Sequence, residues 1–286
     1  MKKVKVAFFA EILFENFDGA SRTMHQLLKR IDTDQFEFLF ICGSGPEQIT
    51  GFECIKIPTI TLPVNSTYAM ALPSLAQNKI KDRLQHFSAD IIHIATPSLL
   101  GNFAIKYAVQ YQIPVISIYH THFVSYVRYY LKHIPFLINK VKQLMANSQK
   151  SFYNSCEKIY VPSESIKNEL IEMGLEPSRM KMWKRGIDLN LFTPEKRNAG
   201  LMTYLTGNNL PTILFASRLV WEKNLETLFR IYDLIQQKQL KVNLLIAGEG
   251  VARKSAQHKM SNAIFTGNLS HQMLSMLYAS ADVFLF

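Results

Sequence analysis

The feature that most constrains the fold is a regular alternation of short strand-like segments with helical segments along almost the whole chain. Runs rich in β-branched and aromatic residues predict strands at Val4–Ala10, Phe36–Cys42, Asp90–Ile94, Val115–Tyr119 and Lys158–Val161. Helical patterns lie between them, near residues 20–31, 74–87, 98–111, 124–154 and 163–173. Such alternation predicts βαβ units, which build a parallel sheet covered by helices.

The alternation stops at residues 186–210, a stretch rich in Gly, Pro, Asn and Asp, and then starts again. Strands are predicted at Thr212–Ala216, Val242–Ala247, Ala263–Phe265 and Asp282–Phe286, with helices near 223–237, 251–259 and 270–279. Turn-forming residues in such a cluster indicate a linker. We therefore expect an α/β protein with two doubly wound, Rossmann-like domains, residues 1–185 and 211–286, joined by a linker at 186–210.

Composition excludes several classes of protein. The chain has 286 residues, 48% of them hydrophobic, which is incompatible with a disordered tail. Its three cysteines are too few for a disulfide framework or a cysteine-based metal site, and they fit a reducing cytosol. No run of 18 apolar residues occurs, and the first apolar run is too short for a signal peptide. We expect a cytoplasmic chain.

The positive charge is concentrated in one segment. The formal net charge is +10, and residues 91–156 contain no Asp or Glu, whereas they contain six Lys and Arg interleaved with aromatic residues. Such a segment attracts anions, either phosphates, nucleic acid or an acidic membrane face. An ordinary solvated helix face with core aromatics is the alternative. Because no pattern of a known nucleic-acid module occurs, we expect no nucleic acid partner.

Candidate ligand-binding residues follow the predicted strands, because open α/β sheets bind ligands at the carboxyl ends of their strands. Gly19 lies in a turn that leads into a helix, where free amides can hold a phosphate or a hydroxyl group. His120 and His122 follow a later strand. They can contact a substrate hydroxyl, ligate a metal or fill a loop; a metal is disfavoured because no carboxylate lies nearby.

The second domain carries a candidate phosphate site. Arg218 follows the strand Thr212–Ala216, and Lys223 lies at the N-terminus of the next helix, where a cation opposes the helix dipole. An anion held by both side chains would reverse that penalty, which outlines a diphosphate cradle. Gly248 and Gly250 follow the next strand. The alternative is a surface charge pair balanced by neighbouring glutamates.

Six short motifs occur in one order along the chain. They are Asp18-Gly19-x-x-Arg22-Thr23, Tyr119-His120-Thr121, Trp183-x-x-Gly186-Ile187-Asp188 with Phe192-x-Pro194, Arg218 with Glu222-Lys223-Asn224-Leu225, Gly248-x-Gly250, and Phe265-x-Gly267. In this combination the chain resembles a family 4 glycosyltransferase of the GT-B fold. It is most similar to the branch that puts sulfoquinovosyl, glucosyl or mannosyl groups on diacylglycerol-type lipids.

The resemblance implies a retaining transfer of a hexose from a UDP- or GDP-sugar to a lipid or glycan hydroxyl, without a metal ion or other cofactor. Arg218 and Lys223 match the diphosphate-binding pair, which stabilises charge on the leaving group. Gly19 matches the loop whose amides reach the donor phosphate, and His120 matches the histidine beside the transferred sugar. The expected catalytic residues are His120, Arg218 and Lys223, and the expected donor-binding residues are Gly19, Arg218, Lys223, Gly248 and Gly250.

One departure from the family concerns the end of the chain. The family's Glu-x7-Glu motif follows the strand that ends here at Phe286, and it does not occur in this sequence. The resemblance therefore implies a shortened or frame-shifted enzyme with an incomplete second domain and impaired donor binding.

Two other functions compete with sugar transfer. One is a non-catalytic remnant that binds an acidic membrane or an acceptor through residues 91–156, peripherally at the inner face of the membrane. The other is a nucleotide-sugar epimerase with the same two-domain layout, against which the run Asp18–Thr23 argues.

Overall fold

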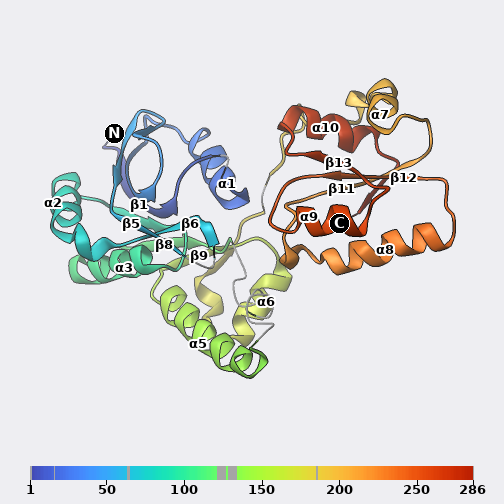
Figure 1. The fold of residues 1–286 in the computed structure, drawn as a ribbon. Helices are drawn as coiled ribbons and strands as arrows, with labels where there is room; N and C mark the ends of the chain where they lie inside the picture. The colour runs from blue at the N-terminus through green and yellow to red at the C-terminus, as the bar shows by residue number, and fades with distance from the viewer. Residues whose placement is uncertain are drawn as a thin grey trace. The chain divides into compact units, whose positions relative to one another are not determined.

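The computed structural model divides into two compact units, residues 1–185 and 186–286 (Figure 1). It describes residues 2–15, 17–62, 65–120, 127, 134–184 and 186–285. The predicted histidine His122 and the basic and aromatic residues at 121–126 and 128–133 lie outside the described residues.

The first unit is built on an eight-stranded sheet with the order β10-β9-β8-β7-β1-β2-β4-β3. Its strands are β1 (Val4–Ile12), β2 (Phe36–Ser44), β3 (Gln48–Ile49), β4 (Phe52–Lys56), β7 (Ile91–Ile94), β8 (Val115–Ile118), β9 (Lys158–Val161) and β10 (Met180–Met182). All neighbouring strands are parallel except β3 and β4. The strands β5 (Thr59–Leu62) and β6 (Asn65–Ala71) form a separate antiparallel hairpin.

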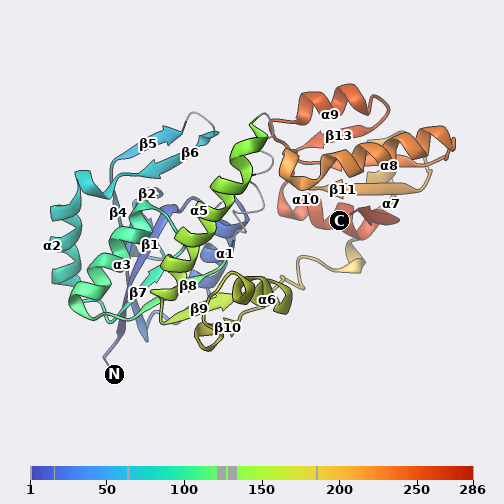
Figure 2. The ribbon, with the colours of Figure 1, turned by 90° about the horizontal axis from the view of Figure 1, so that it is seen from below.

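Helices cover both faces of this sheet because β1 is apolar on both sides. Ala7 and Phe9 belong to one core with residues of four helices, and Phe8 belongs to a second core with Met24 and Leu28 of α1 (Figure 2). The helices are α1 (Gly19–Leu28), α2 (Gln77–Phe87), α3 (Leu99–Tyr111), α5 (Pro135–Asn154) and α6 (Glu164–Glu172), with short 3-10 turns η1 (Pro73–Leu75) and η2 (Pro177–Arg179). Central strands buried on both faces are typical of doubly wound sheets.

The second unit has a four-stranded parallel sheet with the order β13-β12-β11-β14. Its strands are β11 (Thr212–Ala216), β12 (Asn243–Ala247), β13 (Ile264–Gly267) and β14 (Val283–Leu285). Helices α8 (Leu225–Gln237) and α9 (Arg253–Lys259) pack on one face, and α7 (Ala199–Thr206) and α10 (His271–Ser280) pack on the other (Figure 1). The two parallel sheets confirm the expected α/β class.

The stretch 186–210, predicted as a linker, differs from that expectation. It belongs to the second unit and contains η3 (Pro194–Lys196) and α7, whose Met202 is buried against the sheet. Two of its turn-forming residues bound the helix α7. Asn198 caps α7 by accepting the Leu201 amide at 2.9 Å, and Gly207 ends it with φ +72°.

Candidate functional site

The loop after β1 leads directly into the N-terminus of α1. Asp18 Oδ1 accepts the Ser21 amide at 2.8 Å and so caps the helix, of which Gly19 is the first residue. A Cβ atom at Gly19 would meet no atom within 4 Å. Packing therefore does not require a glycine here, and the helix start is open on that side.

A small pocket lies beside this loop, at the carboxyl ends of the central strands of the first unit. It has a volume of about 40 Å³, and Glu11, Asp18, Thr96 and His120 line it together with small and apolar residues. His120 follows β8, and its ring lies 6.5 Å from that of Trp183 in an edge-to-face arrangement. The fold thus brings the predicted residue His120 to the same pocket as the loop that holds Gly19.

Sequence reasoning did not identify Glu11 and Thr96 as site residues. Glu11 is only 3% exposed, and its Oε2 accepts the Ala71 amide at 2.5 Å. Burial raises the pKa of this carboxyl, and the Ser98 hydroxyl and the amides of Ala71 and Leu100 offset part of that rise. Among the described residues, the buried Thr96 Oγ1 has no hydrogen-bond partner.

A buried histidine lies near the pocket. His93 of β7 is 5% exposed and packs against Phe8, with ring centroids 4.4 Å apart. Burial, with a smaller contribution from His120, lowers the pKa of His93 to about 3. This imidazole is therefore neutral at physiological pH.

In the second unit, the loops after β11 and β12 lie against each other. The backbone amide of Leu219 donates to the backbone carbonyl oxygen of Glu249 at 2.7 Å. The amide of Ser217 donates to the carbonyl oxygen of Ala247 at 3.0 Å. A Cβ atom at Gly248 would lie 1.9 Å from the Ser217 oxygen, and one at Gly250 would lie 2.2 Å from the Leu219 oxygen. These two glycines, with φ of +138° and +157°, permit an approach that any side chain would block.

This close packing presents Arg218 at the edge of the sheet. The flanking residues Ser217 and Leu219 are tied to the β12 loop, whereas the Arg218 side chain is 56% exposed. Its guanidinium lies 3.9 Å from Glu222, whose side chain is only 10% exposed. Lys223 is exposed at the end of the 3-10 turn η4 (Trp221–Lys223), directly before α8. Arg218, Lys223, Gly248 and Gly250 therefore all lie at the carboxyl ends of β11 and β12.

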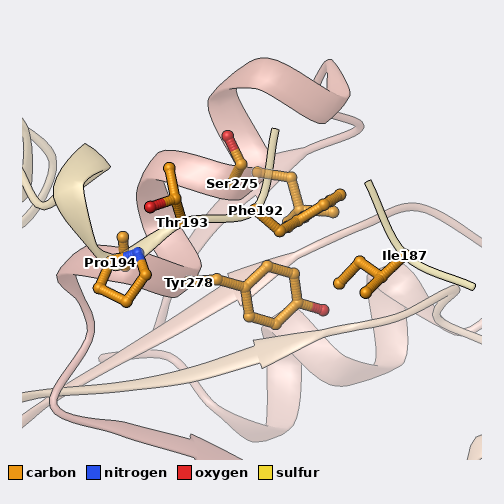
Figure 3. A pocket seen from close by; sticks show the side chains of 8 residues that line it. Ile187, Phe192, Thr193, Pro194, Ser275 and Tyr278 are labelled. Carbon is orange, nitrogen blue, oxygen red and sulfur yellow. The ribbon is translucent and has the colours of Figure 1, made fainter. Parts of the chain in front are cut away.

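A second, apolar pocket occurs elsewhere in this unit. It has a volume of about 610 Å³ and is formed by the segment 187–194 and by α10, with Phe192 and Tyr278 as its aromatic walls (Figure 3). Their ring centroids are 6.0 Å apart. None of the predicted site residues lines this pocket.

Two features are absent from the part of the chain that the structure describes. It holds no cluster of three or more His, Cys, Asp or Glu side chains suited to a metal ion. None of its helices combines the length and the apolar composition that crossing a membrane requires.

Comparison with known families gives a clear match. The profile described as "Glycosyltransferase Family 4" matches residues 17–191, more than half of the chain. The chain belongs to Glycosyltransferase Family 4. A second profile, "Glycosyl transferases group 1", matches residues 210–286, so both units carry glycosyltransferase sequence and the expected enzyme class, a hexosyltransferase, is confirmed.

Individual glycosyltransferases resemble the chain along nearly all of its length. A GDP-mannose-dependent alpha-mannosyltransferase of Corynebacterium glutamicum is 28% identical over 99% of this chain and 67% of that protein. An alpha-monoglucosyldiacylglycerol synthase of Streptococcus pneumoniae is 24% identical over 99% of this chain and 65% of that protein. The chain thus spans about two thirds of the length of these relatives.

A solved structure shows that the fold is shared. Anabaena HepE in complex with UDP and glucose matches with a TM-score of 0.68 and 15% identity, over 98% of this chain and 73% of that one. The α/β architecture expected for a GT-B glycosyltransferase is thereby confirmed, with a smaller second unit.

Proposed function

We propose that this family 4 glycosyltransferase moves a hexose from a UDP- or GDP-sugar to a hydroxyl group of a lipid or glycan, with retention of configuration. The mannosyltransferase relative is named for GDP-mannose, the synthase relative for a glucosyl lipid, and HepE binds UDP and glucose. Family membership favours transfer over the epimerase alternative.

The observation that carries the proposal is the packing of Gly248 and Gly250 on the Ser217–Leu219 backbone. It holds the Arg218 loop at the carboxyl edge of a parallel sheet, which is where such sheets bind nucleotides. The exposed Arg218 and Lys223 side chains then provide two cations for a diphosphate. As the bond to the sugar breaks, charge grows on the leaving diphosphate, and fixed cations stabilise it.

In the first unit, we assign Gly19 and His120 to the reacting sugar. The open start of α1 at Gly19 leaves backbone amides accessible to a phosphate oxygen or a sugar hydroxyl. His120 lies in the pocket beside the same loop and supplies a hydrogen-bonding imidazole there. These assignments of residues give no role to a metal ion.

Binding of the donor tests the proposal directly. Titration calorimetry with UDP and GDP measures the affinity of the chain for the diphosphate without requiring turnover, which suits a chain that spans two thirds of its relatives' length. Arg218→Ala should weaken binding by roughly ten- to a hundredfold, because hydrogen bonds to charged groups contribute about 1.5–3 kcal/mol. Arg230→Ala, on the exposed face of α8, is the matched control and should bind as the unchanged chain does.

Two results of this titration would contradict the proposal. Equal affinity of the Arg218 and Arg230 variants removes the diphosphate assignment. No binding of either nucleotide by the unchanged chain contradicts the donor proposal as a whole.

A second candidate function is attachment to an anionic membrane, with or without sugar transfer. In α5, Phe136 is 81% exposed and Leu144 is 60% exposed, and both lie on the helix that carries Lys140, Lys142 and Lys150. Exposed apolar and basic residues on one helix are typical of interfacial binding. We propose that α5 lies against the surface that presents a lipid acceptor.

Co-sedimentation with phosphatidylglycerol vesicles tests this function separately. Serine at both Phe136 and Leu144 should abolish sedimentation, whereas serine at Leu75, which is 69% exposed and lies outside α5, should not. Sedimentation that is unaffected by the double substitution would contradict the assignment of α5.

A further inference from the structure

Two of the chain's three cysteines meet in the core of the first unit. Cys42 lies near the end of β2 and Cys54 lies within β4, and these two strands are parallel neighbours. Cys54 pairs in register with Phe40, two residues before Cys42, so both cysteine side chains project from the same face of the sheet. Their sulfur atoms are 3.2 Å apart. Neither cysteine lines the small pocket of this unit.

The contact between the two sulfur atoms is a hydrogen bond in which Cys42 keeps the proton. This bond raises the pKa of Cys42, and burial raises it further. The same bond lowers the pKa of Cys54; burial opposes that shift and the nearby Lys56 ammonium adds to it. The pair therefore joins a proton donor to a partner that ionises more readily. The thiolate is the form of cysteine that attacks an oxidant.

The cysteine pair lies beneath a thin cover. Cys42 and Cys54 are 0% and 4% exposed. The backbone of Gly45 lies beside them, and a Cβ atom there would be 2.8 Å from Cys42 Sγ and 3.6 Å from Cys54 Sγ. Glu47 and Gln48, which follow in the same segment, are exposed. Because the cover is a glycine in a surface loop, a local opening of that loop admits a molecule as small as hydrogen peroxide.

A metal ion is the other ligand that two neighbouring thiols favour. A structural site for zinc has four ligands, and among the described residues no third His, Cys, Asp or Glu side chain joins this pair in a group suited to a metal ion. The chemistry that two thiols perform without further ligands is oxidation to a disulfide.

We propose that Cys42 and Cys54 are a redox-active dithiol that hydrogen peroxide closes into an intrachain disulfide. The Cys54 thiolate attacks one peroxide oxygen, the O–O bond breaks, and Cys54 becomes a sulfenic acid while the leaving hydroxide takes up a proton to form water. Cys42 then attacks the sulfenic sulfur, the S–S bond forms, and the hydroxyl group leaves as water with the proton of Cys42. The two thiols lose two electrons, and the peroxide gains them.

The disulfide would tie β4 to β2 and close the segment 42–54 into a loop. Such a link restricts the unfolded chain and therefore stabilises the folded first unit, and a dithiol reductant reopens it. The site does not depend on the proposed transfer of a sugar.

Thiol mapping on the unchanged chain tests the proposal. The folded chain is treated with hydrogen peroxide at pH 8, the peroxide is removed with catalase, and the chain is then unfolded, alkylated with iodoacetamide and digested. Mass spectrometry quantifies each cysteine peptide before and after reduction with dithiothreitol.

Cys156 is the internal control. It is as buried as the pair, but its thiol donates to the Phe152 carbonyl oxygen at 3.6 Å instead of to a second cysteine. Burial raises the pKa of Cys156 to about 12, so about one thiol in ten thousand is ionised at pH 8.

We expect a linked pair of peptides that contain Cys42 and Cys54, formed about tenfold or more faster than the Cys156 thiol is lost, and restored to two thiols by dithiothreitol. The oxidised chain should unfold at a higher urea concentration, followed by the fluorescence of Trp183 in a Trp221→Phe background, because Trp183 packs against the same core. Cys156→Ala should behave in the same way, whereas Cys54→Ala should form no link and gain no resistance to urea.

The inference is overturned if all three cysteines remain alkylatable, if Cys156 is oxidised as fast as the pair, if peroxide links separate chains, or if oxidation ends in a sulfinic or sulfonic acid without a link. A lower urea midpoint of the oxidised chain also overturns it, because the thiols would then react only after β2 and β4 separate. If Cys54→Ala does not fold, the mapping of the unchanged chain against Cys156 decides.

Discussion

Replacing Gly248 by alanine should destabilise the second unit more than the same replacement at any other loop glycine of that unit. The new Cβ would lie 1.9 Å from the Ser217 oxygen, about 1.1 Å closer than real Cβ contacts allow. The obstacle is backbone, and the Ser217 amide is itself bound to Ala247 at 3.0 Å. Separating the loops would break that bond and the bond from Leu219 to Glu249, at about 1 kcal/mol each.

Backbone strain adds to this cost. A φ of +138° belongs to a region that is essentially restricted to glycine, and occupying it costs a side-chain-bearing residue about 1–3 kcal/mol. Together with the lost hydrogen bonds, we expect Gly248→Ala to lower the free energy of unfolding of this unit by about 3–5 kcal/mol. The displaced Arg218 loop should also lose affinity for UDP and GDP.

Gly207 provides the matched control for the strain. It also has positive φ, +72°, but a Cβ atom there would meet nothing within 4 Å. Gly207→Ala should therefore cost only the left-handed conformation, about 1 kcal/mol. The difference between the two variants isolates the steric contact between the loops.

Urea denaturation followed by tryptophan fluorescence measures both variants. The chain has two tryptophans, so a Trp183→Phe background leaves Trp221 of the second unit as the reporter. A Gly248→Ala variant that is no less stable than Gly207→Ala would refute the reasoning. It would mean that the loops after β11 and β12 separate without cost, and that the glycines do not hold the Arg218 loop in place.

Two other predictions concern the first unit. Because the pKa of His93 is lowered to about 3 mainly by burial, and secondarily by His120, the unfolded chain binds a proton below pH 6.5 that the folded chain does not. The free energy of unfolding therefore falls as the pH decreases from 6.5 towards 3, by about 2 kcal/mol at pH 5. His93→Phe should remove this contribution of His93 to the pH dependence. Parallel pH profiles of the unfolding free energy for the variant and the unchanged chain would contradict the prediction. Asp18→Ala removes the cap on the Ser21 amide and should lower the free energy of unfolding by about 1 kcal/mol. Asp18→Asn should cost less, because asparagine also caps helices. Equal losses for the two variants in urea titrations would contradict the role of the cap.

The sheet strands and most helices could be predicted because the sequence repeats one pattern. The strands Lys158–Val161 and Thr212–Ala216 have the predicted bounds, since each is a short run of apolar and β-branched residues. The strands β3 to β6 were not predicted. β3 has only two residues, and β5 pairs with β6 in a hairpin separate from the main sheet, so neither follows the βα alternation on which the prediction depended.

The helix α7 was missed for a different physical reason. Asn and Gly are favoured in linkers and also at helix ends, and sequence alone does not separate these roles. Asn198 and Gly207 bound a helix whose Met202 is buried in one core with Leu214 and Leu245 of the sheet. Only the tertiary contact shows that the segment packs.

The candidate site was predicted in part, and what was missed follows from packing. Glycines, histidines and cations after strands are visible in a sequence, and the parallel sheets place them at common edges. Glu11 is also visible, as an acid that ends the first apolar run, but its burial and its hydrogen bond to the Ala71 amide arise only in the folded first unit.

The two units differ in the charge that they offer to a ligand, and this difference predicts which unit binds the diphosphate. Among the described residues, the small pocket of the first unit is lined by no Lys or Arg and contains a buried carboxyl group, whereas the loops after β11 and β12 carry the exposed Arg218 and Lys223. A diphosphate is stabilised by fixed cations, which the loops after β11 and β12 provide. We therefore expect Arg218→Ala to lower the affinity for UDP and GDP, and Glu11→Gln to leave it unchanged.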